Sequence, residues 1–226
     1  KNLQLLTDVE GAFPADPRIV PVAKKIDAIN YDEMLELASS GSKVMQTRAV
    51  EFAQKHNIPF EVRSTFSTKS GTAVKKKVKS LEDTLVSGVA IDKNQVRVSI
   101  VELPDRPGAA AAVFKVMASA GVVVDMIVQN VARNSKANLT FTVPSEDAFR
   151  AEKALREHLK EGAGGKLGKS TNIAKISVVG VGMRSHSGVA SKFFEALANA
   201  GINMLMISTS EIKISVAVNP EKGDDA

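Results

Sequence analysis

An internal repeat with an offset of 80 residues constrains the fold of this chain more than any other feature of its sequence. Residues 104–130 align with residues 184–210, so that glycine, phenylalanine, alanine and methionine recur at matching positions. The matches are Gly108 with Gly188, Phe114 with Phe194, Ala118 with Ala198, Ala120-Gly121 with Ala200-Gly201, and Met126-Ile127 with Met206-Ile207. Self-similarity at a fixed offset indicates two copies of one structural module.

Each copy is expected to contain a strand, a glycine turn, a helix, a second glycine turn and two further strands. The first copy is expected to hold strand 96–103, helix 108–120, strands 122–131 and 137–143, and a helix at 145–160. The second copy is expected to hold strand 173–181, helix 188–200, and strands 202–209 and 211–218. This order is the start of a βαββαβ ferredoxin-like module.

The two copies differ in how their sheets are completed. The first copy can finish its fourth strand within residues 165–170, whereas the second reaches Ala226 about where its second helix should form. An unassigned strand at residues 85–91 lies just before the first copy. Because an unpaired edge exposes a row of backbone donors and acceptors, we expect this strand to complete the second copy. The first copy would then be inserted into the second.

The residues before the repeat have the pattern of a different domain. A strand at residues 3–6 runs into a loop that contains two prolines, which exclude regular structure there. Helices at 31–37 and 42–56 and a strand at 58–63 follow. A helix followed by a strand is typical of an α/β layer, but the earlier strands of such a domain are absent. We therefore expect the opening segment to be an incomplete α/β unit.

Composition excludes several classes of function. With no tryptophan, one tyrosine and 4% aromatic residues, the chain lacks the stacking side chains of single-strand nucleic-acid binders, despite a net charge of +5. Its basic run is therefore expected in a solvated linker or an edge strand: Lys75, Lys76, Lys77 and Lys79. No apolar run reaches the roughly 20 residues of a membrane helix, and the absence of cysteine fits a cytoplasmic protein. No metal site is expected from the three scattered histidines, His56, His158 and His186.

Several segments, in the correct order, resemble motifs of the aspartokinase family. Residues 7–18 (TDVEGAFPADPR) are similar to the family's nucleotide-loop motif, TDVDGVYTADPR. Residues 33–38 (EMLELA) and 41–51 (GSKVMQTRAVE) are similar to its EMLELA and GSKVLQxRAVE segments, although some members have His-Pro in place of Gln46-Thr47. VQNV at 128–131 and ISTSEI at 207–212 are similar to the signatures of the family's amino-acid-sensing ACT domains.

The resemblance implies an α+β fold: tandem ferredoxin-like βαββαβ ACT domains, the first inserted into the second, preceded by the C-terminal part of an α/β amino-acid-kinase domain. The implied boundaries are 1–74 for the kinase portion, 75–84 for a linker, 95–170 for the first ACT domain, and 85–94 with 171–226 for the second, whose C-terminal helix is truncated. The family's KFGGTS motif, which holds the phosphates, is missing from the sequence. We therefore expect no kinase activity from this chain alone.

The resemblance also implies part of a site for Mg-bound ATP in the complete enzyme. The residues concerned are Thr7, Asp8, Phe13, Asp16, Arg18, Lys43 and Val44. The first two would contact the base or ribose, Arg18 the phosphates, and Lys43 the nucleotide from a helix start; Phe13 stands where the family usually has tyrosine. Taken without the resemblance, residues 16–18 form only a surface turn and Lys43 is a solvated lysine.

The first glycine turn of the repeat has the chemistry of an amino-acid site. Small residues at a helix start leave backbone N–H groups uncovered, which favours an anion such as an α-carboxylate. A nearby carboxylate can accept hydrogen bonds from the ligand's ammonium group, and an amide suits a hydroxyl-bearing side chain. The candidate residues are Asp105, Pro107, Gly108, Ala109, Ala110 and Gln129. The same residues also fit a plain strand-to-helix turn with an ordinary acidic cap.

The family resemblance implies threonine at this first site. Val122 and Val123 would line one side of it, and Asn203 and Met204 of the second module would help to complete it. A related pocket, for lysine, would draw on carboxylates that suit a long cationic side chain. Its residues are Asp125, Gly188, Val189, Ala190, Ser210 and Glu211. Since some relatives have threonine in place of Ala190, the assignment of ligands to the two pockets stays open. Asp125 also fits a solvated strand carboxylate.

The resemblance implies that the chain is the regulatory region of an aspartokinase. Threonine, lysine or both would bind at ACT dimer interfaces and feedback-inhibit the ATP-dependent phosphorylation of L-aspartate, in the cytoplasm. The chain would form a homodimer through its ACT domains, or a heterotetramer with a full-length catalytic subunit, with no nucleic acid or membrane partner. Two alternatives are a catalytic kinase, which the missing glycine loop disfavours, and a stand-alone ACT module for amino-acid binding or assembly.

Overall fold

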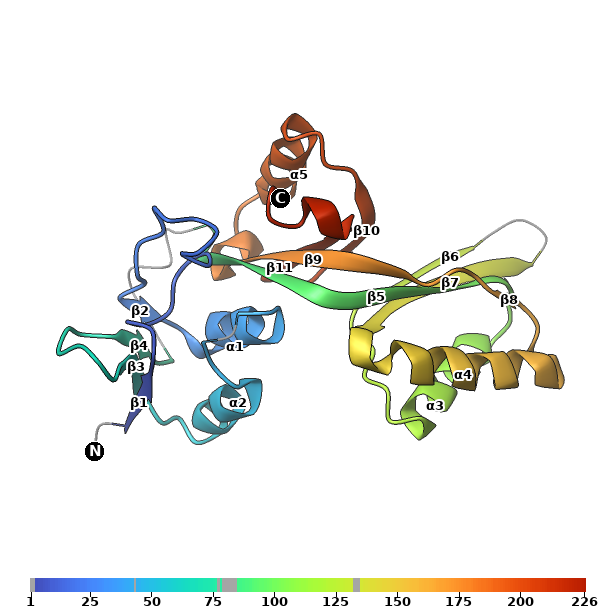
Figure 1. The fold of residues 1–226 in the computed structure, drawn as a ribbon, viewed down its shortest axis with the longest axis horizontal. Helices are drawn as coiled ribbons and strands as arrows, with labels where there is room; N and C mark the ends of the chain where they lie inside the picture. The colour runs from blue at the N-terminus through green and yellow to red at the C-terminus, as the bar shows by residue number, and fades with distance from the viewer. Residues whose placement is uncertain (1–2, 43, 77, 79–84, 132–134) are drawn as a thin grey trace.

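The computed structural model describes residues 3–42, 44–76, 78, 85–131 and 135–226, and it has three parts (Figure 1). An opening segment lies at one end of the molecule and a first βα module at the other end. A second βα module lies beside the long strand that runs between them. None of the described helices is both long enough and apolar enough to cross a membrane.

The opening segment is a small sheet packed against two helices. Its strands lie in the order β1 (Leu3–Thr7), β3 (Phe60–Ser64), β4 (Thr72–Val74) and β2 (Ala28–Ile29), and β1 pairs with β3 in parallel. Helices α1 (Tyr31–Ser39) and α2 (Thr47–Lys55) bury apolar side chains against this sheet. Helix α1 begins where it does because the Asn30 side chain accepts a hydrogen bond of 2.9 Å from the Glu33 N–H.

Two sequence expectations for this segment were wrong in detail. Helix α2 begins at Thr47 and not at residue 42, because Val44 and Met45 lie in a turn and pack against the core. Strands β2 and β4 were not expected, since strands of two and three residues are too short to show a periodic pattern. Of the expected linker at 75–84, residues 77 and 79–84, with Lys77 and Lys79, lie outside the described residues.

The repeat forms one continuous sheet with the strand order β10-β11-β9-β5-β7-β6, and β8 pairs with β5 beside this path. The strands are β5 (Gly88–Pro104), β6 (Ile127–Val131), β7 (Lys136–Pro144), β8 (Lys166–Leu167), β9 (Thr171–Val179), β10 (Met204–Thr209) and β11 (Lys213–Val218). The return strands start later than expected at residues 122 and 202. In the first copy the N–H of Asp125 and the C=O of Met126 bond to the backbone of Thr142 ahead of the regular ladder.

Strand β5 corrects the expectation of two separate strands at 85–91 and 96–103. The polar run between them has the composition of a turn, but it forms a bulge inside one strand. The Asp92 carboxylate accepts hydrogen bonds from the Asn94 N–H at 2.9 Å and from the Gln95 side chain at 2.8 Å. These bonds tie the bulge together, so the strand continues through it.

The two ends of β5 belong to different modules. Residues 88–92 pair with β9 and residues 100–104 pair with β7 and β8, whereas residues 95–97 lie between β9 and β7 and pair with both. The first module therefore has the order β8-β5-β7-β6 and the second the order β5-β9-β11-β10, which is the strand order of a βαββαβ ferredoxin-like unit in both cases. The predicted fold class, with the first module inserted into the second, is confirmed.

Each module's own helices cover only one face of its sheet, and the other face is called its helix-free face. Helices α3 (Ala109–Ser119) and α4 (Ala148–His158) cover the first module, and α5 (Val189–Asn199) covers the second (Figure 1). The expected helix at 145–160 is α4, flanked by a short 3-10 turn and a final π turn, and the last element is the short turn Pro220–Lys222. The two modules also share a pattern of burial, since residues 121–130 and 201–210 have the same class of exposure at every equivalent position.

The helix-free face of β9 and β11 is the meeting point of all three parts. At one end it packs against α1, where Val179 and Ala90 join the core of the opening segment. At the other end Ile173 and Ala217 form a small apolar cluster with Met126 and Met206. The second module therefore contacts both the opening segment and the first module.

Candidate functional site

The structure has two helix starts opened by glycine. Gly108 (φ 90°) and Gly188 (φ 93°) lie in the left-handed region, and neither α3 nor α5 receives a side-chain cap. A Cβ atom at either glycine would meet no other atom within 4 Å, so the backbone angle requires glycine and crowding does not. The first intrahelical bonds are donated by the N–H groups of Ala112 and Lys192, so the preceding N–H groups have no acceptor within their helix; that of Ala109 donates to the Arg106 C=O at 3.2 Å.

A pocket of about 390 Å³ lies at the start of α3. Its lining comprises Leu103, Arg106, Pro107, Gly108, Ala109, Ala112 and His158. The predicted Pro107, Gly108 and Ala109 therefore line a cavity together, whereas Asp105 and Ala110 lie beside it. The sequence did not reveal Arg106 and His158 as site residues, because His158 arrives from the last turn of α4. Both can carry positive charge, which suits a carboxylate at a helix start.

The remaining residues predicted for the first site are dispersed in the single chain. Gln129 is exposed on β6, opposite Leu139 in the sheet register. Val122 is buried in the core of the first module, whereas the neighbouring Val123 is exposed. Asn203 is exposed and Met204 packs into the core of the second module.

The start of α5 borders a smaller cavity of about 270 Å³, which is lined by apolar side chains and Lys192. Val189 is part of this lining, next to Gly188 and the half-buried Ala190. Ser210 and Glu211 lie in the turn between β10 and β11. The Glu211 carboxylate forms an ion pair of 3.1 Å with Arg184, in the segment that leads into α5.

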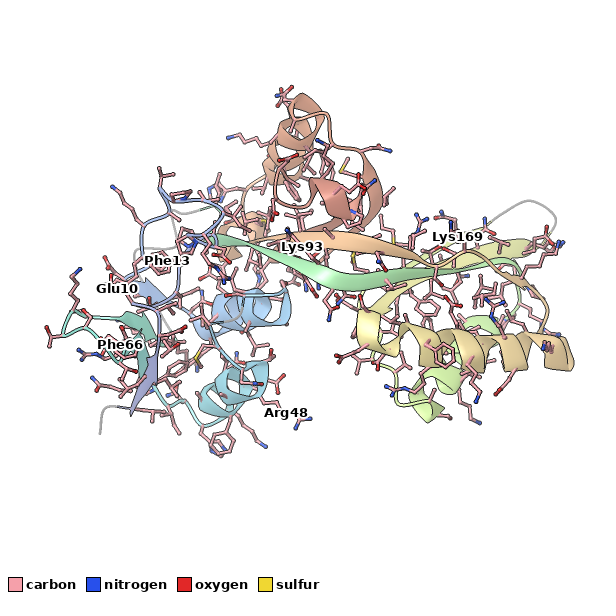
Figure 2. All side chains as sticks on the ribbon, viewed as in Figure 1. Glu10, Phe13, Arg48, Phe66, Lys93 and Lys169 are labelled. Atoms are coloured by element: carbon pink, nitrogen blue, oxygen red, sulfur yellow. The ribbon has the colours of Figure 1, made fainter. Side chains whose placement is uncertain are left out.

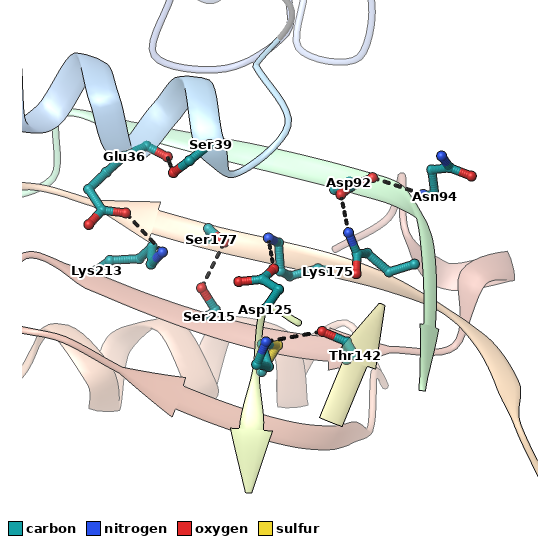
Figure 3. A network of polar contacts seen from close by, with 12 residues as sticks. Glu36, Ser39, Asp92, Asn94, Asp125, Thr142, Lys175, Ser177, Lys213 and Ser215 are labelled. Carbon is teal, nitrogen blue, oxygen red and sulfur yellow. Dashed lines mark hydrogen bonds and ion pairs between the residues drawn. The ribbon is translucent and has the colours of Figure 1, made fainter. Parts of the chain in front are cut away.

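Asp125 does not stand free at the edge of the sheet. Its carboxylate pairs with the ammonium group of Lys175, a side chain of β9 that is only 2% exposed (Figure 3). Thr142 fixes the backbone beside it, with its C=O accepting from the Asp125 N–H at 3.0 Å and its hydroxyl from the Met126 N–H at 3.1 Å. Sequence reasoning missed Lys175, although a lone charge in a strand of otherwise uncharged residues could have signalled it.

The predicted nucleotide segment forms a partly exposed loop whose Gly11 and Ala12 are buried, and the Ala12 N–H donates to the Thr72 hydroxyl at 2.8 Å. The Arg18 guanidinium donates to the Asp16 carboxylate at 2.6 and 3.0 Å, and this hydrogen bond with its charge raises the pKa of Arg18. The Thr7 hydroxyl donates to Asp8 at 3.0 Å. Phe13 and Val44 are half-buried, and Phe13 lies close to the small sheet (Figure 2). Lys43 lies outside the described residues.

Buried and half-buried carboxylates of α1 connect the opening segment to the second module. Glu33 is fully buried, and its Oε1 accepts from the Ser87 hydroxyl and, at 3.0 Å, from the Val181 N–H. One turn later, Glu36 forms an ion pair of 2.8 Å with Lys213 of β11. Within the described ranges, no cluster of three or more His, Asp or Glu side chains could hold a metal ion.

Comparisons with known proteins agree with this architecture. The model of the amino acid kinase family matches residues 1–64, and two ACT domain models match residues 96–163 and 176–226. An aspartokinase of Pseudomonas aeruginosa is 48% identical over 218 residues, which covers 95% of this chain and 53% of that protein. The chain thus spans about half the length of this relative.

Two solved relatives are similar to this structure, one over the whole chain and one over part of it. The ligand-free regulatory subunit of aspartate kinase from Thermus thermophilus is 40% identical, with a TM-score of 0.59 over 63% of this chain and 93% of that one. Escherichia coli aspartokinase III is matched at 25% identity, over 99% of this chain and 50% of that one, with a TM-score of 0.85 in its complex with aspartate and ADP (R-state). With lysine and aspartate bound (T-state) it gives a TM-score of 0.78 at 26% identity, over 99% and 49%. This chain belongs to the aspartokinase family, as the end of its amino-acid-kinase domain followed by two ACT domains.

Proposed function

We propose that this chain is the regulatory region of an aspartokinase. Threonine, lysine or both bind at its ACT domains and lower the rate at which the complete enzyme phosphorylates L-aspartate with Mg-bound ATP. The observation that carries the proposal is the pair of uncapped helix starts at Gly108 and Gly188, at equivalent positions of the repeat. The solved complex of E. coli aspartokinase III with lysine supports it, since a relative binds one of the two amino acids.

The start of α3 has the chemistry that holds the α-carboxylate of a free amino acid. N–H groups without an acceptor in the helix and the positive end of the helix dipole attract an anion, with a contribution of about 0.3–2 kcal/mol. Arg106 adds positive charge to the same pocket, and the His158 side chain lines it. Asp105, just outside, accepts from the ligand's ammonium group, and an exposed edge residue such as Gln129 bonds a side-chain hydroxyl.

A second copy of the chain completes the sites at the helix starts of Gly108 and Gly188. Gln129 does not line the pocket at α3 in the single chain, and β6 and β10 end the strand path of the sheet. Both edge strands expose apolar side chains, among them Ile127, Leu205 and Ile207. ACT domains of two copies pair along these edges, as a homodimer or as a heterotetramer with a full-length catalytic subunit in the cytoplasm. We keep the domain boundaries proposed from the sequence. They are 1–74 for the kinase portion, 75–84 for the linker, 95–170 for the first ACT domain, and 85–94 with 171–226 for the second.

The contact between α1 and the second ACT domain transmits the effect. An effector shifts a conformational equilibrium only by its difference in affinity for the two states. Glu33 and Glu36 link α1 directly to Val181 and Lys213, so a movement of the second ACT domain moves the end of the kinase domain with it. The predicted nucleotide loop, residues 7–18, lies in the same segment as α1.

Calorimetry on the purified dimeric chain tests the proposal. We expect saturable heat with threonine, with lysine or with the two together, and a G108A variant should weaken the response at the first site. The absence of binding heat with both amino acids, alone and combined, would refute the proposal. A coupled assay of ADP release with aspartate and ATP should find no turnover by this chain, and turnover would contradict its assignment as a regulatory part only.

A further inference from the structure

Strand β5 runs from the opening segment to the pocket at the start of α3 (Figure 1). Its 17 residues span about 50 Å, at roughly 3.3 Å per residue. At the far end Leu103 lines the pocket, and Arg106, which lines it too, follows two residues after the strand. One continuous strand therefore connects this pocket to the segment that carries the predicted nucleotide loop.

The near end of β5 is bonded to the predicted nucleotide loop itself. The Val89 N–H donates to the Pro14 C=O at 2.6 Å. Among the described strands, residues 88–92 pair only with β9, which leaves their other edge open to the loop. On its other side the loop is fixed inside the opening segment, where the Ala12 N–H donates to the Thr72 hydroxyl. The loop is thus held between the opening segment and the ACT sheet.

Two glycines allow the opening segment to approach β5 closely. A Cβ atom at Gly88 would lie 3.1 Å from the Pro14 oxygen and 3.0 Å from a methyl group of Leu37 on α1. A Cβ atom at Gly41, in the turn after α1, would lie 2.5 Å from the Ile91 oxygen. Since the φ of Gly88 is not positive, the close approach and not the backbone angle favours glycine there. A displacement of β5 therefore presses directly on the Pro14 carbonyl.

The bulge in β5 is held together by hydrogen bonds. The Asp92 carboxylate accepts from the Asn94 N–H at 2.9 Å and from the Gln95 side chain at 2.8 Å. Directly after the bulge, residues 95–97 are paired on both edges, with β9 and with β7. Rigid secondary structure of this kind carries coupling between distant sites. We therefore expect a shift at one end of β5 to reach the other end instead of being absorbed at the bulge.

We propose that β5 couples the pocket at α3 directly to the predicted nucleotide loop. An amino acid that binds beside Leu103 shifts the strand, and the Val89–Pro14 bond with the close contact at Gly88 carries this shift to residues 7–18. This coupling differs from the contact between α1 and the second ACT domain, because it acts on the loop itself. The inference rests on the proposed function, because it requires an amino acid to bind at the ACT domains.

Hydrogen exchange of backbone amides in the whole chain, measured by NMR with saturating threonine or lysine, tests this coupling. Calorimetry on the same samples shows which amino acid binds. In the wild type we expect the bound amino acid to change the exchange rates of the Val89 amide and of amides in residues 7–18 by about fivefold or more, the lower end of allosteric coupling.

The variant G88A should lose this response, because its added methyl group pushes the Pro14 carbonyl away from the strand. Its amides should change by less than about twofold on binding, while the Kd of the amino acid changes by less than about threefold. G168A is the matched control: a Cβ atom at Gly168 would lie 3.3 Å from the Ser99 oxygen, inside the first ACT domain. It should respond as the wild type does.

A second pair of variants tests the strand between its two ends. D92A removes the hydrogen bonds of the bulge and should abolish the response of the loop, whereas D92N keeps an oxygen for the Asn94 N–H and should retain it. The coupling is refuted if a bound amino acid leaves the wild-type amides unchanged, if G88A or D92A responds as the wild type does, or if G168A loses the response as well. Binding heat in any of these cases leaves the proposed function standing, whereas the absence of heat with both amino acids overturns the proposed function and this inference together.

Discussion

Removal of the Glu33 side chain should lower the free energy of unfolding more than removal of any exposed carboxylate in this chain. Glu33 is fully buried on α1, and its Oε1 accepts hydrogen bonds from the Ser87 hydroxyl and the Val181 N–H. In E33A both donors lose their acceptor inside the interface between the kinase segment and the second ACT domain. A buried donor left without a partner costs about 1–3 kcal/mol, so two of them predict a loss of about 3 kcal/mol or more. E33Q keeps a carbonyl acceptor, and it should lose only about 1 kcal/mol.

Urea unfolding, followed by circular dichroism, measures these losses as free energies of unfolding. E51A is the matched control, because Glu51 is an exposed carboxylate on α2, and a surface substitution of this kind stays within about 0.5 kcal/mol. Since the bonds of Glu33 join two parts of the chain, E33A should also uncouple their unfolding into two transitions. A loss below about 1 kcal/mol in E33A would refute the reasoning, because two buried hydrogen bonds cannot be removed at so small a cost.

Three further outcomes follow from local geometry. In G108A the side chain meets no steric obstacle, but the left-handed angle should cost about 1–2 kcal/mol, measured by thermal unfolding, with weaker threonine binding as the second readout. The hydroxyls of Ser177 and Ser215, 2.8 Å apart and buried, should show a coupling of about 1 kcal/mol in a double-alanine cycle of urea unfolding. The hydrogen bond from the Gly71 N–H lowers the pKa of the Glu61 carboxyl. The stability that this carboxylate contributes is therefore present above its unfolded pKa of about 4.3 and is lost as the pH falls. In E61Q the free energy of unfolding should change less than in the wild type between about pH 5 and pH 3.

The βαββαβ order could be predicted because its signals are local. The glycines at 108 and 188 mark backbone angles that other residues avoid, and the apolar periods between them identify strands and helices. The continuity of β5 could not be predicted in the same way. Asp92 and Asn94 are turn-forming residue types, and only the hydrogen bonds across the bulge show that the strand continues.

The candidate site was predictable only in part, for a related reason. Residues 105–110 are contiguous, so their joint position at a helix start follows from the sequence. His158 and Arg106 meet in one pocket because α4 packs beside α3, and no pattern of spacing encodes that contact. Lys175 and Asp125 are 50 residues apart and belong to different ACT domains, so their pairing follows from tertiary structure alone.

Polar pairs on the helix-free face of β9 and β11 explain how one sheet can serve two neighbours. Along this face lie Lys213 against Glu36 of α1, Ser215 against Ser177, and Lys175 beside Asp125 of the first ACT domain (Figure 3). Apolar burial alone would tolerate small slips of these surfaces, because it has no direction. A buried charge needs its partner in place, so the two ion pairs disfavour any docking that separates them, whereas Ser215 and Ser177 pair within the sheet of the second ACT domain. The arrangement thus gives the second ACT domain defined positions against both neighbours, which a regulatory element must have if a ligand at one contact is to change the other.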